Sequence, residues 1–392
     1  MKTLSCNTDA FFKQSVAVAE HYGFRNIDDL QAEATKKGTS VLDLEKQKST
    51  KKNFEQRILK AVLAKCNKAV ELKKKQPLMF YTPSLVSHPS TPNVRVSTLS
   101  LNAVGTNDPL AEVVLLKSAT SIVEELGIEN YTVRINSIGD SDSSARFVRE
   151  VTGLLNAHAG ELTDKQRTVL QKKPEALITE LYVERHPLVA DFPTPLEYLT
   201  TPSRRHFKEM LELLEHTGIP FELDDRLYAD PGVYSHSVFE ISESSDGDEP
   251  DETIARGGRY DELTRGYVRG TVPSTGIVIA MQTKDKRSTV GRPRRRKPRA
   301  CLIHIGREAR IRSIDIVETF RREKIPIEQC LHYERFSEQM EYAQAHKIKF
   351  IIIMGQREAR DGVVLIRNAD DRSQKTVRIE SLPSVFKELA VR

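Results

Sequence analysis

Two adjacent glycines inside an otherwise β-type segment constrain the fold of this chain more than any other feature. Gly257 and Gly258 lie in IARGGRYD (254–261), which follows the apolar segment SVFEIS (237–242) and precedes the apolar run PSTGIVIAM (273–281). Glycine packs poorly within a strand, so a pair of glycines there marks a place where backbone approaches something closely. The pattern therefore predicts neighbouring strands of an antiparallel sheet with a close contact at this pair.

Composition indicates a protein with more than one domain and a sizeable core. The chain has 392 residues, of which 39% are hydrophobic and 29% charged, enough for two or three domains. No apolar run approaches the roughly 20 residues that span a bilayer, and the N-terminus lacks the apolar stretch of a secretory signal. The cysteines, Cys6, Cys66, Cys301 and Cys330, are widely spaced. We therefore expect a cytoplasmic protein with reduced thiols, no membrane partner and no metal site.

The positive charge of the chain is concentrated in one segment. Residues 286–299 contain eight cations and no acid, whereas the whole chain has a net charge of +5, so the remainder is net negative. Cations of this kind can neutralise RNA phosphates, and a solvated, flexible tether is the alternative. The RNA-binding candidates in this segment are Arg292, Arg294, Arg295, Arg296, Lys297 and Arg299.

Periodicity places the other elements. Helical patterns occur at residues 8–24, 53–72, 112–126 and 201–217, with strands at 78–81, 94–104 and 131–135. The segment 84–93, which contains Pro89 and Pro92, is predicted as a loop, and the acidic segment 246–252 as a solvated hairpin tip, with a magnesium site as the alternative there. Beyond residue 300, strands alternate with helices, which predicts a small α/β domain with a mixed sheet.

The order of these segments resembles the histidyl-tRNA synthetase family, which belongs to the class II aminoacyl-tRNA synthetases. The resemblance is carried by VFE (238–240), ARGGRYDEL (255–263), VPSTGIVIAM (272–281), NAVGTNDPLAEVVLL (102–116) and INSIGD (135–140), and by FIIIMGQREARDGVVLIRNADDRSQKTVRI (350–379). It implies an α+β fold: an antiparallel class II sheet with helices, followed by an α/β anticodon-binding domain with a mixed sheet. The expected domains are a catalytic-type core at 1–285 with an inserted subdomain near 162–227, a basic linker at 286–299, and an anticodon-binding-like domain at 300–392. The first 80 residues match weakly.

The resemblance also implies a reaction, in which ATP adenylates histidine and the histidyl group is transferred to tRNA, with Mg²⁺ as a cofactor. Arginines suit this chemistry because preorganised cations stabilise charge developing on phosphates. At the positions where the family has its motif 2, histidine-motif and motif 3 arginines, this chain has Val86, Ala229 and Thr283. We therefore expect no catalytic residues there, and ATP and Mg²⁺ only if ligase activity remains. Arg226 and Arg287 are alternatives if the alignment shifts.

Seven residues are expected to line what remains of the family's pocket: Tyr81, Thr98, Tyr234, Gly257, Gly258, Arg259 and Gln282. For Arg259 and Asp261, structural pairing with their neighbours is the competing interpretation. Three functions stay open: a catalytically degenerate relative that keeps tRNA or protein binding, a divergent active histidine–tRNA ligase, and a regulatory subunit resembling that of ATP phosphoribosyltransferase. The expected partner is tRNA, and a homodimer or another protein partner is possible from the resemblance.

Overall fold

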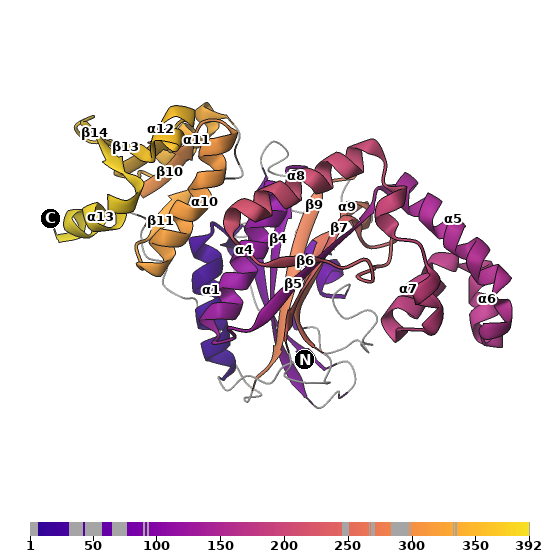
Figure 1. Ribbon diagram of the computed structural model, residues 1–392. Helices are drawn as coiled ribbons and strands as arrows, with labels where there is room; N and C mark the ends of the chain where they lie inside the picture. Colours follow the sequence, from indigo (N-terminus) through magenta and orange to yellow (C-terminus); the bar gives the residue numbers. More distant parts are fainter. Residues whose placement is uncertain are drawn as a thin grey trace.

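The computed structural model describes residues 7–30, 42–43, 57–64, 77–88, 91, 94–244, 251–265, 267, 271–283, 298, 300–331, 333 and 335–391. Within these residues, a larger unit that ends at Thr283, here called the body, packs against a smaller unit that begins at Ala300, here called the module (Figure 1). All six RNA-binding candidates of the basic segment lie outside the described residues. No helix in the described part of the chain is long and apolar enough to cross a membrane.

The body is built on one large mixed sheet. Its strand order is β1-β3-β4-β9-β8-β7-β5-β6, with β2 also paired to β3. The strands from β3 to β5 in this order pair antiparallel, whereas β1, β2 and β6 pair parallel with their neighbours. The bounds are β1 Arg25–Asn26, β2 Leu42–Asp43, β3 Leu78–Ser87, β4 Arg95–Val104, β5 Tyr131–Gly139, β6 Phe221–Leu223, β7 Ser235–Glu243, β8 Glu252–Arg259 and β9 Ser274–Gln282. This confirms the predicted antiparallel centre of the sheet.

The two faces of this sheet carry different cores. One face, here called the helix face, packs Leu99 and Ile279 against α1 (Thr8–His21), α4 (Leu110–Glu125) and α8 (Thr201–Thr217). The opposite face, here called the pocket face, buries Phe80, Val96 and Val278 in a second apolar cluster. Because successive side chains of a strand alternate between faces, strands β3, β4, β5, β7 and β9 contribute to both clusters.

Strand β3 is longer than the sequence predicted. The prediction ended this strand at Tyr81, which was wrong, because β3 continues through Pro83 to Ser87. The loop predicted at 84–93 was therefore wrong over 84–87, whereas residues 88 and 91 lie outside any strand. Pro83 pairs with Leu99 of β4. On its other side, β1 pairs with Phe80 and Tyr81, and β2 begins to pair at Ser84. Pro83 thus lies between the segment of β3 that pairs with β1 and the segment that pairs with β2. At this place its missing N–H interrupts no hydrogen bond to either short strand.

The glycine pair lies where three strands pack closely, as predicted. A Cβ on Gly257 would lie 2.2 Å from the carbonyl oxygen of Gly276 in β9, and one on Gly258 would lie 2.4 Å from that of Ser237 in β7. What approaches these glycines is therefore the backbone of the neighbouring strands. The tip of the β7–β8 hairpin, 245–250, includes most of the predicted acidic loop and lies outside the described residues.

Three helices, α5 (Ser141–Ala157), α6 (Asp164–Lys172) and α7 (Pro174–Glu184), project from the end of the body that lies away from the module (Figure 1). Asp140 caps α5 by accepting a hydrogen bond from the Ser143 N–H. The helices bury Leu155, Leu170 and Leu181 in the cluster of the pocket face. This part of the chain extends one core of the body without adding strands to its sheet.

The module has the mixed sheet that the sequence predicted. Its order is β11-β10-β12-β13-β14, with β10 parallel to both β11 and β12 and the remaining pairs antiparallel. The elements are β10 Ala300–His304, α10 Arg307–Arg322, β11 Ile327–Gln329, α11 Phe336–Ala345, β12 Phe350–Met354, α12 Gln356–Asp361, β13 Val363–Asn368, β14 Gln374–Arg378 and α13 Leu382–Val391. Val- and Ile-rich runs bounded by glycine or polar residues specify these short strands.

Helix α10 joins the module to the body, and the contact between them is here called the seam. Tyr22, directly after α1, donates a hydrogen bond to Glu318 of α10 over 2.5 Å, and His21 bonds the carbonyl oxygen of Val317. Ion pairs from Arg307 to Glu212 and from Arg310 to Asp108 flank these bonds. The apolar cluster of the helix face continues through the seam into Ile314 and other module residues, so the two units share one core.

Candidate functional site

The three residues expected at the positions of the family's arginines are built into the interior of the body. Val86 near the end of β3 is 4% exposed and Ala229, in the loop before β7, is 5% exposed, and both belong to the apolar cluster of the pocket face. Thr283 follows β9, and its hydroxyl bonds Thr8 Oγ1 at 2.7 Å and Ser97 Oγ at 2.9 Å. None of the three offers a cation, and their surroundings are those of packed core.

Four of the predicted pocket residues share the pocket face. Thr98 pairs with Ala280 and Gln282 with Val96, which place both on that face. Tyr234 is 8% exposed in the same cluster, and its ring would lie 3.0 Å from a Cβ on Gly258. Thr98 donates its hydroxyl hydrogen to the Ser84 carbonyl oxygen at 3.3 Å. Tyr234 therefore packs against Gly258, the fourth of these residues, and Thr98 bonds strand backbone.

The other three predicted residues lie on the helix face and are not brought together with the first four. Tyr81 belongs to the helix-face cluster and donates a hydrogen bond to Glu20 of α1 at 2.9 Å. Gly257 pairs with Phe239 and Ile277, which lie in that cluster too. Alternation along β8 puts Arg259 on the side of Gly257. The predicted set is therefore divided between the two faces of the sheet.

Arg259 is the centre of a buried ionic cluster. Its side chain is 1% exposed and contacts Asp261 at 3.1 Å, Glu112 of α4 at 3.5 Å and the carbonyl oxygen of Thr106 at 3.1 Å. Asp261 in turn accepts a hydrogen bond from the Ser274 N–H at 2.7 Å. Arg259 and Asp261 thus connect α4, β8 and β9 through contacts within the fold.

Glu112 is the residue of this cluster that the sequence analysis missed. It is fully buried and accepts hydrogen bonds from His206 of α8 at 2.9 Å and from Ser237 of β7. Burial alone would raise the pKa of Glu112, but His206, Arg259 and Ser237 outweigh it and hold the pKa below its ordinary value. The sequence did contain a signal for it. Glu112 lies three positions before Leu115, so it is a charged residue on the otherwise apolar face of the predicted helix.

His236 lies beside this cluster in a strained backbone conformation. Its φ angle is +53°, and its ring centroid is 5.5 Å from that of His206. Burial, followed by the positive charges of His206 and Arg259, lowers the pKa of His236. Neutral His236 therefore fits beside the cationic side of the cluster. Because the charged groups Glu112, Arg259 and Asp261 are paired within the fold, the cluster joins helices to strands.

The pocket face does carry cations, but carboxylates bind them. Arg134 of β5 and Arg256 of β8 lie 3.7 Å and 3.9 Å from oxygens of Glu240, between them on β7. Arg134 also pairs with Asp251, and Arg256 donates to the Tyr228 carbonyl oxygen at 3.0 Å. The triphosphate of ATP would have to compete with these internal acceptors, so the residues present do not fit a bound nucleotide. Within the described residues no group of three or more His, Cys, Asp or Glu side chains could hold a metal ion.

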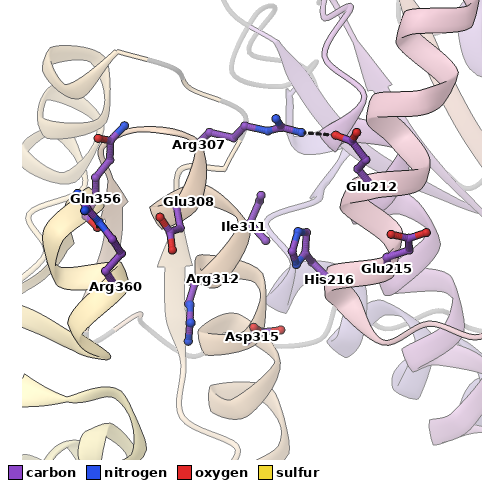
Figure 2. Close-up of a pocket in the computed structure, with 10 residues that line it drawn as sticks. All are labelled: Glu212, Glu215, His216, Arg307, Glu308, Ile311, Arg312, Asp315, Gln356 and Arg360. Carbon is purple, nitrogen blue, oxygen red and sulfur yellow. Dashed lines mark hydrogen bonds and ion pairs between the residues drawn. The ribbon is translucent and has the colours of Figure 1, made fainter.

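A cleft of about 760 Å³ lies where α8 of the body faces α10 and α12 of the module. Figure 2 shows Arg307 crossing it to bond Glu212, with Arg312 and Arg360 on the module side and Glu215 on the body side. Acids and bases alternate along its walls. Its charge is therefore mixed, unlike the single-sign surface that typically follows a nucleic-acid backbone.

The edge strand of the module's sheet carries exposed cations on both of its faces. Lys375 and Arg378 of β14 are exposed and, being three residues apart in a regular strand, point to opposite faces. Arg357 of α12 is also exposed and lies 4.0 Å from Asp361. The family model described as "Anticodon binding domain" matches residues 300–389, which is almost the whole module. This surface is the candidate nucleic-acid interface in the described part of the chain.

Comparisons with known proteins point in the same direction. The chain is 27% identical over 292 residues to the histidine–tRNA ligase of Acholeplasma laidlawii, covering 73% of this chain and 69% of that protein. It is 25% identical over 291 residues to the histidine–tRNA ligase of Streptococcus uberis, covering 74% and 68%. Among solved structures, the apo histidyl-tRNA synthetase of S. aureus superposes with a TM-score of 0.52 at 16% identity, covering 96% of this chain and 95% of that chain. That likeness supports the fold.

Proposed function

Because the chain belongs to the histidyl-tRNA synthetase family, we propose that it binds tRNA through its module and does not form histidyl-adenylate. The observation that carries this proposal is the environment of Val86, Ala229 and Thr283. Two of these side chains are packed in an apolar core, and the third uses its hydroxyl within the fold.

The physical argument concerns charge. Adenylation develops negative charge on the α-phosphate and on the departing pyrophosphate, and preorganised cations stabilise it. Removing one such group typically lowers the rate about 10²- to 10³-fold. Three losses would approach roughly 10⁶-fold if they were independent, although groups that act as a unit are not additive. A chain without these cations is therefore a poor catalyst for this step, whatever else its fold retains.

Two observations support retained tRNA binding. The match to the anticodon-binding family covers residues 300–389, and cations are exposed on β14 and α12 of the module. The seam also holds the module against the body through a common core, so an RNA bound by the module would lie at a fixed distance from the body. Cationic contacts of this kind give affinity that falls with salt.

Pyrophosphate exchange tests the catalytic half of the proposal. The full chain is incubated with histidine, ATP, Mg²⁺ and labelled pyrophosphate, with the A. laidlawii ligase as the positive control. We expect no histidine-dependent exchange above background. Clear histidine-dependent exchange would replace the proposal with a working ligase, the divergent enzyme that the sequence left open.

Salt-dependent tRNA binding tests the other half. In the full chain, Lys375→Glu with Arg378→Glu should weaken binding to tRNA and reduce the slope of log K against log salt by about one for each phosphate that is no longer neutralised. The matched control is Lys165→Glu with Lys172→Glu on α6, two exposed lysines of the body. This control makes the same change in net charge but should leave the slope nearly unchanged. Equal effects of the two pairs would show that the module is not the binding surface.

A further inference from the structure

Two cysteine side chains touch inside the module. Cys301 lies on β10, Cys330 directly follows β11, and their sulfur atoms are 3.6 Å apart. Both residues are fully buried, in a small apolar cluster with Tyr333, Ile348 and Ile351. Both are free thiols. They are 29 residues apart in the sequence, so only the fold brings them together.

The strand geometry directs both side chains to one face of the sheet. In the parallel β10–β11 pair, Cys301 is opposite Glu328. Cys330 is two residues beyond Glu328, and residues two apart in an extended chain point the same way. A disulfide needs its sulfurs about 2.05 Å apart, so the observed contact must shorten by side-chain rotation and a small backbone shift.

We propose that Cys301 and Cys330 form a disulfide within the module when the protein meets a small disulfide oxidant such as oxidised glutathione. One cysteine thiolate attacks a sulfur of the oxidant, a mixed disulfide forms, and one glutathione thiolate leaves. The second cysteine thiolate then attacks the protein sulfur of that mixed disulfide and releases the other glutathione. The protein loses two protons and two electrons, and one oxidised glutathione becomes two reduced molecules.

The residues on either side of Cys330 take part in contacts at the seam, so the proposed disulfide would lie next to it. Its neighbour Gln329 donates a hydrogen bond to the Tyr22 carbonyl oxygen of the body at 2.6 Å. Its other neighbour, Leu331, accepts two hydrogen bonds from Arg310, which also pairs with Asp108 of the body. A bridge from Cys330 to β10 would fasten this segment at both sides. Oxidation should therefore stabilise the contact between the module and the body.

Local opening must precede the reaction, because both sulfurs are buried. The hydrogen bond to Cys301, followed by burial, raises the pKa of the Cys330 thiol well above its usual range, so this thiol is protonated in the closed fold. Tyr333 shares the cluster with both cysteines and lines a cavity of about 300 Å³ between the module and the body. Movement of Tyr333 into this cavity is a short route by which the oxidant reaches the sulfurs.

The test uses the full chain with Cys6→Ser and Cys66→Ser, which leaves only the two module cysteines. After this variant is incubated in its folded state with oxidised glutathione, its free thiols should fall from two to none. The intact mass should fall by about 2 Da through loss of two hydrogens, and digestion should yield the peptides of Cys301 and Cys330 joined. The melting temperature should rise by several degrees, since the bridge constrains the unfolded chain, and a reducing agent should reverse the change.

Single-cysteine variants are the controls. In the same background, Cys301→Val or Cys330→Val keeps an apolar side chain at the site, and each should show no mass loss and no rise in melting temperature. Two free thiols after oxidation of the native protein would overturn the proposal. So would stable glutathione adducts on both cysteines, or joined peptides that form only after unfolding in denaturant.

Discussion

At the scale of single residues, the Arg259 cluster shows a structural role for a segment that resembles a family motif. The arginine is enclosed by Glu112, Asp261 and the Thr106 carbonyl oxygen, so its charge is used to join α4 to β8 and β9. A buried pair of this kind contributes little net stability when complete, but leaves an uncompensated charge when broken. Selection for a folded chain is therefore sufficient to retain it.

We expect Arg259→Met to destabilise the protein by about 3–5 kcal/mol, because Glu112 and Asp261 lose a buried partner. Urea unfolding at neutral pH measures the change. The control is Arg265→Met, since Arg265 is exposed and its 3.0 Å pair with Glu262 lies at the surface. The control should cost less than about 1 kcal/mol. If both variants cost the same, the cluster is not a structural anchor.

His304 predicts a pH dependence of stability in the module. It is 2% exposed, and burial, followed by the positive charge of Arg310, lowers its pKa from 6.5 to about 4. Between those values the unfolded chain binds more protons than the native protein. Stability is therefore fully present above pH 6.5 and falls as the pH drops towards 4, by up to roughly 3 kcal/mol at about 1.4 kcal/mol per pKa unit.

The difference between wild type and His304→Gln isolates this contribution, because His21 and His236 also have lowered pKa values and are present in both proteins. Denaturant unfolding at several pH values from 7 to 4 should give a shallower decline for the variant. Parallel curves would show that His304 does not titrate differently in the two states. Glu318, whose pKa is lowered from 4.5 to about 2, begins to lose its own contribution near pH 4.5, and it is likewise present in both proteins.

At the scale of elements, the close packing of β8 gives a matched pair of glycine substitutions. Gly257→Ala would place a methyl group 2.2 Å from the Gly276 carbonyl oxygen and 2.7 Å from the ring of Phe239, so the strands must separate. We expect a loss of several kcal/mol or insoluble protein. Gly153→Ala in α5 meets nothing within 4 Å and should stabilise the protein by roughly 0.5–1 kcal/mol. Thermal melting of both variants checks the contrast, and a neutral Gly257→Ala would contradict the packing.

The sequence predicted most elements but not what joins them. The mixed sheet of the module was predicted because strand and helix patterns alternate there, and apolar runs such as Phe350–Met354 end at a glycine. Pro83 misled the prediction of β3, because the two short parallel partners that accommodate it have no signal of their own. The neutral residues at 86, 229 and 283 can be read directly from the sequence. Their burial, and the division of the expected pocket between two faces of the sheet, depend on how the strands pair, which the sequence alone does not give.

At the scale of the whole molecule, the seam makes the body and the module one cooperative unit. Burial would raise the pKa of Glu318, but hydrogen bonds from Arg321 and Tyr22 lower it to about 2. The carboxylate is therefore ionised at neutral pH and bonds α10 to α1. Since the helix-face core also runs through the seam, we expect the wild-type protein to unfold in a single transition.

Glu318→Ala should weaken this coupling by roughly 3 kcal/mol, because it leaves Tyr22 and Arg321 without their shared acceptor in a buried contact. Arg321 keeps Glu125 at 3.3 Å, which limits the loss. Hydrogen exchange should accelerate at amides of α1 and α10 that face the seam, while those of β4 and β9 stay protected. The control is Glu323→Ala, directly after the same helix, which removes an exposed pair with Lys387. It should change neither the coupling between the two units nor the exchange of these amides. Equal exchange in the two variants would mean that apolar packing alone holds the module in place. RNA bound to the module would then be positioned relative to the body without any help from this carboxylate.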